Sequence, residues 1–394
     1  MRQRLAVLVL TAVGWTLAEP AFAIPAFARR YKVECHFCHD IYPKLNSMGQ
    51  RFKERGFRME REDAFDASKW LRSVPVAGRA EGNHTFLEGA DDVNFGFLKG
   101  ISAGNLGARV SYWVDDGVVV NEKQRSADKR FTHVKPDNAW LRFEVVPGGK
   151  LYAKAGRIEL DLPFTQTRTP HLFSYDVYLA NTGFETDAIG SFQDGVEIGG
   201  DLPRDTHWSA AVVKGHNSDE ARTFSKDAGK FDGNLFLRLS KRLGRHRVGA
   251  FTYIGRNTLA LAPNAAWDDH LLRVGADAAV WISRLNLYGV YAYGRNDNSI
   301  ADPAHPSGTK EPLDFSGGFA QADYHVRDDL ALTLRLNAVN RPPGATNAPN
   351  KTFSGLFPGV QAWVLDGYVK LSFEYGFLNQ DQKSLGAVQA DVAF

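Results

Sequence analysis

The sequence is poor in sulfur and holds no long apolar segment. Its 394 residues include only two cysteines and three methionines. The two cysteines lie too close together in the sequence to staple a large fold with a disulfide. The one apolar run that stands out covers residues 5–17, whereas a membrane-spanning helix needs about 20 residues. A polytopic helical membrane protein is therefore excluded, and the positions of the few sulfur atoms become informative.

The chain also has little net charge. Its 47 basic residues nearly balance its 45 acidic residues, which gives a formal charge of +2. Proteins that bind nucleic acid usually carry a strongly basic footprint, so no nucleic-acid partner is expected. The mean hydropathy of −0.31 agrees with the exclusion of a polytopic helical membrane protein. The chain contains 37 glycines and 12% aromatic residues, a composition that indicates a sheet-rich protein with many turns.

The first 23 residues have the pattern of an export signal. Arg2 and Arg4 precede the apolar run, and Ala21-Phe22-Ala23 has the small-x-small form of a cleavage site. This order is typical of a secretory signal peptide that is removed from the mature protein. The sequence therefore predicts a signal peptide over residues 1–23 and an exported mature chain.

Both cysteines belong to one motif, Cys35-His36-Phe37-Cys38-His39. The spacing C-x-x-C-H is typical of covalent c-type haem attachment, in which the two thiols hold the haem and the next histidine binds its iron. No further cysteine exists to complete a cysteine-based zinc site, and the βαβ pattern of a thioredoxin-like protein is absent. We expect one haem c on Cys35 and Cys38, with His39 as its proximal iron ligand.

A short helix is predicted after the motif. Pro43 suits a first helical position, and Gly56 suits a C-terminal cap. Three apolar residues recur at i, i+3 and i+7, the spacing of one helix face: Leu45, Met48 and Phe52. We expect residues 24–72 to form a small α-helical monohaem cytochrome segment, which buries too little surface to be stable without its haem.

The sequence alone leaves the sixth iron ligand open. Met59 follows the predicted helix and is the candidate distal ligand, because the chain there can fold over the haem. Met48 lies on the helix itself, so it is either an alternative ligand or a residue that packs against the porphyrin. His36, His84 and an open coordination position are also compatible with the sequence.

The remainder of the chain, residues 73–394, alternates in polarity with period two. Residues 235–240 show the pattern, since every second residue is leucine. Residues 141–145, 330–337 and 369–375 repeat it. The predicted strands begin near residues 74, 93, 107, 137, 150, 193, 206, 231, 246, 268, 284, 313, 330, 351, 367 and 384. A soluble β-sandwich also alternates in this way, so the connections must decide between the two folds.

Short and long connections alternate along this region. Short turns are predicted at 104–106, 146–149, 202–205, 242–245, 281–284, 326–329 and 365–367. The other breaks, such as 86–92, 161–192 and 257–267, are predicted as mostly long loops. Outer-membrane barrels have short periplasmic turns, long extracellular loops and an even number of strands. The fold class predicted is all-β: an antiparallel outer-membrane barrel of about 16 strands, preceded by the small helical cytochrome segment.

The last strand gives further support for the barrel. The last strand places Val388, Ala390, Val392 and Phe394 on one face, and a terminal aromatic residue on the lipid face is common in outer-membrane proteins. The loop at 161–192 is the longest and the best candidate for folding into the lumen. Charged residues predicted to line the lumen show a basic excess: Arg142, Lys154, Arg157, Arg238, Arg335 and Lys370, with Glu144 and Glu374.

The N-terminal segment resembles a known family. The matching residues are Ile24-Pro25-Ala26-Phe27-Ala28-Arg29-Arg30, then Cys35–His39, then Pro43-x-Leu45-x-x-Met48-Gly49-x-x-Phe52-Lys53-x-x-Gly56-Phe57. This stretch is similar to the fused monohaem cytochrome c–porins of iron-oxidising bacteria. The family has glutamine where this chain has Arg30, and tyrosine where it has Phe57.

The resemblance implies electron transfer across the outer membrane by an Fe(II)-oxidising oxidoreductase. Extracellular Fe(II) would be oxidised at the cell surface, and its electron would pass through the haem to a periplasmic c-type cytochrome or another carrier. One haem cannot cover about 30 Å of hydrocarbon. We therefore predict that the cytochrome segment plugs the barrel lumen and lifts the haem toward the outer loops.

Two more functions are compatible with the sequence. The first is a solute porin, anion-selective or not, that the cytochrome segment caps. The second is an electron conduit for a donor other than Fe(II). Ion conductance separates the capped porin from a plugged conduit, and a comparison of donors addresses the second function.

Overall fold

The structure is a computed structural model of the chain. It describes residues 25–41, 43–59, 76–87, 90–119, 138–164, 172, 176–179, 189–190, 192–214, 233–262, 265–299, 311–340, 353–364, 369–378 and 385–393. The predicted signal peptide over residues 1–23 lies outside the described residues. Among the described residues, no helix is long and apolar enough to cross a membrane.

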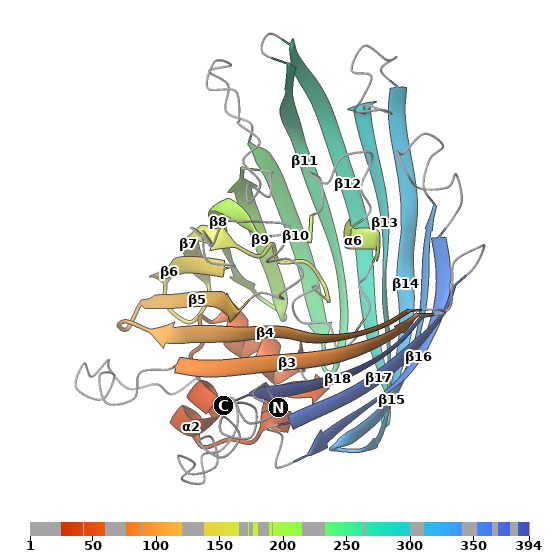
Figure 1. The fold of residues 1–394 in the computed structure, drawn as a ribbon. Helices are drawn as coiled ribbons and strands as arrows, with labels where there is room; N and C mark the ends of the chain where they lie inside the picture. The colour runs from red at the N-terminus through yellow and green to blue at the C-terminus, as the bar shows by residue number, and fades with distance from the viewer. Residues whose placement is uncertain are drawn as a thin grey trace.

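Sixteen antiparallel strands form a closed barrel (Figure 1). They are β3 (Val76–Leu87), β4 (Ala90–Asn105), β5 (Val110–Val119), β6 (Asn138–Val146), β7 (Leu151–Ile158), β8 (Gln193–Leu202), β9 (Thr206–Val213), β10 (Asn234–Leu243), β11 (His246–Ala262), β12 (Ala265–Ile282), β13 (Leu285–Ser299), β14 (Glu311–Arg327), β15 (Leu330–Asn340), β16 (Phe353–Val364), β17 (Val369–Leu378) and β18 (Leu385–Ala393). Each strand pairs with its neighbour in sequence, and β18 pairs with β3 to close the sheet.

The period-two pattern decides which side chains face outward. In β10, Leu235, Leu237 and Leu239 are exposed on the outside, whereas Phe236 and Arg238 are buried in the lumen. Successive residues of a strand point to opposite faces, so one alternating sequence builds an apolar exterior and a polar interior. The exposed apolar exterior suits a lipid bilayer, because contiguous apolar surface of this extent is rare on soluble monomers.

The sequence prediction of strands is confirmed closely. The largest differences at strand starts are three residues, for example Ala90 for the predicted 93 and Asn234 for the predicted 231. Two predicted long loops are wrong: β3 and β4 are joined by residues 88–89 alone, and β11 and β12 by residues 263–264. The reason is that backbone pairing between the flanking strands continues through the predicted loop residues.

The connections define two ends of the barrel. We call the end that carries the connections 106–109, 147–150, 203–205, 244–245, 283–284 and 328–329 the short-turn end, and the opposite end the loop end. Bacterial barrels place their short turns in the periplasm. The short-turn end is therefore the periplasmic end of this barrel.

The N-terminal elements lie at the short-turn end. They are α2 (Pro25–Tyr31), the 3-10 helix η1 (Cys35–Phe37), β1 (His39–Ile41), β2 (Lys44–Leu45) and α3 (Ser47–Glu54). In Figure 1 they are the red elements beside the lower ends of the strands. We call residues 25–59 the plug, because their side chains meet residues that line the barrel lumen.

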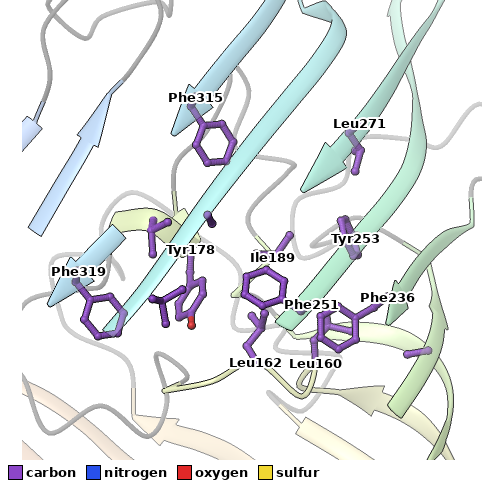
Figure 2. Packing of buried hydrophobic residues seen from close by; sticks show 14 of the residues in the cluster. Leu160, Leu162, Tyr178, Ile189, Phe236, Phe251, Tyr253, Leu271, Phe315 and Phe319 are labelled. Carbon is purple, nitrogen blue, oxygen red and sulfur yellow. The ribbon is translucent and has the colours of Figure 1, made fainter. Parts of the chain in front are cut away.

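A second segment enters the lumen, as predicted for the loop at 161–192. The described residues between β7 and β8 include the helix α6 (Asp176–Leu179), which contacts β14 and β15. Leu160, Leu162, Tyr178 and Ile189 pack against aromatic residues of the wall (Figure 2). Figure 2 labels these wall residues: Phe236, Phe251, Tyr253, Phe315 and Phe319. The inward segment is thus packed along the side of the lumen that β9–β15 form.

A charge placed on the outer face tests the membrane assignment of the barrel wall. Leu334 lies near the middle of β15 and is 46% exposed on the outside. We expect Leu334→Arg to lower the folding free energy in lipid vesicles by about 2–4 kcal/mol, because arginine on a lipid face is costly at mid-depth. Urea titration of vesicle-inserted protein measures this change.

Leu334→Ala is the matched control, since it shortens the same side chain without adding charge. If Leu334→Arg is no more destabilising than Leu334→Ala, this face does not contact lipid.

Candidate functional site

The Cys35–His39 motif forms a tight turn. In η1 the amide of Cys38 donates to the carbonyl of Cys35 at 3.1 Å, and the amide of Phe37 donates to that of Glu34 at 3.1 Å. Both cysteines are free thiols and half-buried. Burial, and to a smaller extent the neighbouring Cys35, raises the pKa of the Cys38 thiol to about 11. The turn therefore presents two reduced sulfurs three residues apart.

His39 follows the turn and is oriented by a backbone acceptor. Its Nδ1 lies 3.2 Å from the carbonyl oxygen of Pro43. A carbonyl only accepts hydrogen bonds, so Nδ1 carries the proton and Nε2 carries the lone pair. A hydrogen bond of this kind fixes the tautomer and ring orientation of histidines that bind metals. If a haem is attached at this motif, His39 would bind its iron through Nε2.

Asn46 holds the turn against the following helix. Its Nδ2 donates to the carbonyls of His36 and Phe37, both at 3.1 Å. Its Oδ1 accepts the amides of Met48 and Gly49 at 2.9 Å, which makes it the N-cap of α3. The prediction that the helix starts at Pro43 is wrong, because residues 44–45 pair with β1 instead. The preference of asparagine for N-caps was the signal available in the sequence.

Gly49 permits the close approach of α3 to the motif. A Cβ atom at this position would lie 2.1 Å from the carbonyl oxygen of Cys38. Any larger residue would push the helix away from the turn. The glycine that belongs to the family-like pattern is thus required by the local packing.

These residues fit a covalently attached haem c. Two half-buried thiols lie in one turn, and the adjacent imidazole has its Nδ1 bound to a carbonyl. Cys35 and Cys38 would hold the haem, and His39 would bind its iron. The haem would supply one-electron redox chemistry.

The two methionines near the motif lie in different surroundings. Met48 is half-buried in the first turn of α3. Met59 packs against the cluster of Phe52, Phe57 and Ala103. The assignment of Met59 or Met48 as the distal ligand stays a prediction.

Aromatic side chains anchor the plug to the wall. The Phe57 ring centroid lies 5.4 Å from that of Trp113 and 5.8 Å from that of Trp140, on β5 and β6. Phe27 and Phe52 also pack against Phe57 from within the plug. Aromatic pairs at this separation contribute about 0.5–1.5 kcal/mol beyond the burial of their area. Phe57 therefore joins the core of the plug to the barrel.

Three ion pairs add to this anchoring. Lys44 Nζ lies 2.7 Å from Asp323 Oδ2, and both side chains are buried. Glu54 pairs with Arg242 of β10. Arg58 Nη1 lies 3.3 Å from Glu144 Oε1 of β6. The prediction that the N-terminal segment closes the lumen is consistent with these contacts, since all three partners line the lumen.

The position of the motif along the barrel differs from the prediction. Arg58 donates to the carbonyls of Gly107 and Val110 at the 106–109 turn. Asp40, next to His39, shares a cavity with Arg245 of the 244–245 turn. The motif therefore lies at the short-turn end, and the prediction that it is lifted toward the outer loops is wrong. The reason is that the charges complementary to the plug lie at the periplasmic ends of the strands.

Comparison with solved structures identifies the barrel fold. The chain is similar to OmpF of Salmonella typhi in a complex with daunomycin, with a TM-score of 0.58 and 11% identity over 81% of this chain and 97% of the other. It is also similar to the anion-selective porin of Comamonas acidovorans, with a TM-score of 0.55 and 12% identity over 81% and 98%. OmpT of Vibrio cholerae with loop L8 deleted gives a TM-score of 0.53 and 13% identity over 81% and 98%.

No protein-family model matches the sequence, and no curated protein matches it either. At these identities the solved structures establish the porin-like barrel fold alone. Together with the apolar exterior, the fold makes this chain an outer-membrane β-barrel.

Removing one partner of a buried ion pair tests the anchoring of the plug. Lys44→Met would leave the carboxylate of Asp323 buried and uncompensated, which costs about 3–5 kcal/mol. We expect faster hydrogen exchange over residues 44–54, measured by mass spectrometry in detergent.

The double variant Lys44→Met/Asp323→Asn is the matched control, because it removes both charges. Exchange should return most of the way to that of the native chain. Equal exchange in the single variant and the native chain would show that Lys44 does not hold the plug.

Proposed function

We propose that this outer-membrane barrel is an electron conduit that accepts electrons from extracellular Fe(II) and passes them, through one haem c in its plug, to a periplasmic electron carrier. The observation that carries the proposal is the C-x-x-C-H turn with His39 Nδ1 bound to the Pro43 carbonyl. Pore formation alone does not require a C-x-x-C-H motif. The resemblance of this segment to fused cytochrome–porins supports the same interpretation.

The position of the plug suits delivery to the periplasm. The turn that carries Cys35 and Cys38 lies near the periplasmic end, and Phe37 within it is exposed. A soluble carrier can therefore approach the haem from the periplasm without entering the barrel.

The donor must approach from the other side. The motif lies near the short turns, so a donor that stays at the outer loops is separated from it by much of the membrane thickness, about 30 Å. We propose that Fe(II) enters the lumen from the loop end and gives its electron to the haem within the barrel. A bulky Fe(II) chelate should then react far more slowly than hydrated Fe(II).

An anion porin capped by the plug is the second candidate. It is favoured by the buried basic side chains of the lumen, such as Arg142, Arg238 and Arg335. The likeness to an anion-selective porin concerns the fold alone. The ion pairs of the plug and the packed inward segment oppose free passage of solutes, so we rank this candidate second.

Electron transfer is tested in intact cells that export the protein and mature haem c. We expect Fe(II) added outside to reduce the haem, seen as the rise of the reduced α-band in visible spectra. Cys35→Ser/Cys38→Ser should hold no covalent haem on a denaturing gel stained for haem and should show no band.

The control is Ser47→Ala, a half-buried residue of the same plug whose side chain makes no described hydrogen bond. It should keep both the haem and its reduction. If the native protein carries haem but external Fe(II) does not reduce it, Fe(II) is not the electron donor. High anion conductance in planar bilayers would favour the porin instead.

A further inference from the structure

A cavity lies between the plug and the wall, beside the Cys35–His39 turn. Its volume is about 70 Å³, which is room for a few water molecules or a small oxyanion but not for a large ligand. Asp40, Lys44 and Asn46 line it from the plug, and the β10–β11 hairpin lines it from the wall. Asn46 also bonds the turn itself, so the cavity opens directly next to the motif.

The lining is strongly basic. Asp40 is the single acidic side chain among the described lining residues, and it is joined by five basic ones: Lys44, Lys53, Arg242, Arg245 and Arg247. Lys44 and Arg242 are neutralised by their ion pairs with Asp323 and Glu54. The other three cations therefore determine the charge of the cavity.

Two of these cations belong to a crowded network of charges. Lys53 Nζ is 4.0 Å from Glu159 Oε2. Arg247 Nε is 3.8 Å from Asp277 Oδ1, but Asp277 already accepts two bonds from Arg238, at 2.9 and 3.2 Å. The carboxylate nearest to Arg247 is thus committed to another guanidinium, so Arg247 is only weakly compensated.

Arg245 stacks over the ring of Trp281, and its Cζ atom lies 4.1 Å from the ring centroid. It makes no ion pair within 4.0 Å with any residue that the structure describes. The acidic side chain that shares the cavity with it, Asp40, interacts with Arg245 electrostatically but lies beyond ion-pair distance.

Buried donors in the cavity also lack acceptors. The Nε atoms of Arg242 and Arg247 are buried and have no hydrogen-bond partner among the described residues. A buried donor left without a partner destabilises the fold. An oxyanion in the cavity would offer acceptors to such donors, because guanidinium groups bind carboxylate and phosphate in a fork geometry.

We propose that this cavity is an oxyanion site, in which Arg245, Arg247 and Lys53 bind a carboxylate or phosphate group. Two sources share that chemistry: the propionates of the haem on Cys35 and Cys38, and a free oxyanion from the periplasm. The haem source rests on the proposed function, whereas the oxyanion site itself does not depend on haem.

The test uses the full chain in detergent, with inorganic phosphate as the probe and isothermal titration as the measurement. Haem-free protein, Cys35→Ser/Cys38→Ser, should bind phosphate. Adding Arg245→Gln/Arg247→Gln should weaken this binding at least tenfold. Arg327→Gln is the matched control, because Arg327 is an exposed arginine at the same end of the barrel, beside the 328–329 turn, and it pairs with Asp329. Heat-modifiable mobility on gels shows that each variant folds.

The haem-loaded protein distinguishes the sources. If propionates fill the site, loaded protein does not bind phosphate, and Arg247→Gln lowers the haem midpoint potential because a positive charge near the haem is lost. If a free oxyanion fills it, loaded and haem-free proteins bind phosphate alike. Absence of phosphate binding to haem-free protein, or equal binding by the arginine variant, would overturn the proposal. Failure to attach haem would instead count against the proposed function alone.

Discussion

The solvation of charge inside a closed barrel governs this structure. Alternation places apolar residues toward lipid and leaves arginine, lysine and carboxylate side chains in the lumen. Charges removed from water must be paired or hydrogen-bonded. Arg335 and Glu374 meet this demand within the wall, at 2.9 Å. Asp323 and Arg242 meet it through Lys44 and Glu54 of the plug. The wall and the plug therefore stabilise each other.

The pairing of charges between wall and plug also determines where the Cys35–His39 turn lies in the barrel. Since its partners lie near the short turns, the plug is held at the periplasmic end, and the Cys35–His39 turn is held with it. The inward segment narrows the lumen on the β9–β15 side, where Leu160 and Tyr178 meet the aromatic wall. Under the proposed function, a donor would enter from the loop side and a carrier would approach the plug side.

Local sequence patterns predicted the strands of the wall, whereas the position of the plug depends on contacts between residues far apart in the chain. Strand starts follow from alternation and turns, which are properties of a few neighbouring residues, so they were predicted within three residues. The side of the lumen that the plug occupies depends on pairs such as Glu54 and Arg242, which are 188 residues apart in the chain. A periodic pattern of neighbouring residues gives no information about a pair so far apart in the chain. The proposed roles of Cys35, Cys38 and His39 were predicted from their spacing, whereas the Pro43 carbonyl that orients His39 became visible only in the folded plug.

The position of the haem iron within the barrel tests the account most directly. A nitroxide attached at Asp328→Cys, in the 328–329 turn, and another at Ala262→Cys, at the loop end of β11, would report their distances to the paramagnetic ferric haem through enhanced spin relaxation. The account predicts strong relaxation enhancement at position 328 and little at position 262. Stronger enhancement at position 262, or none at either position in a haem-loaded protein, would contradict it.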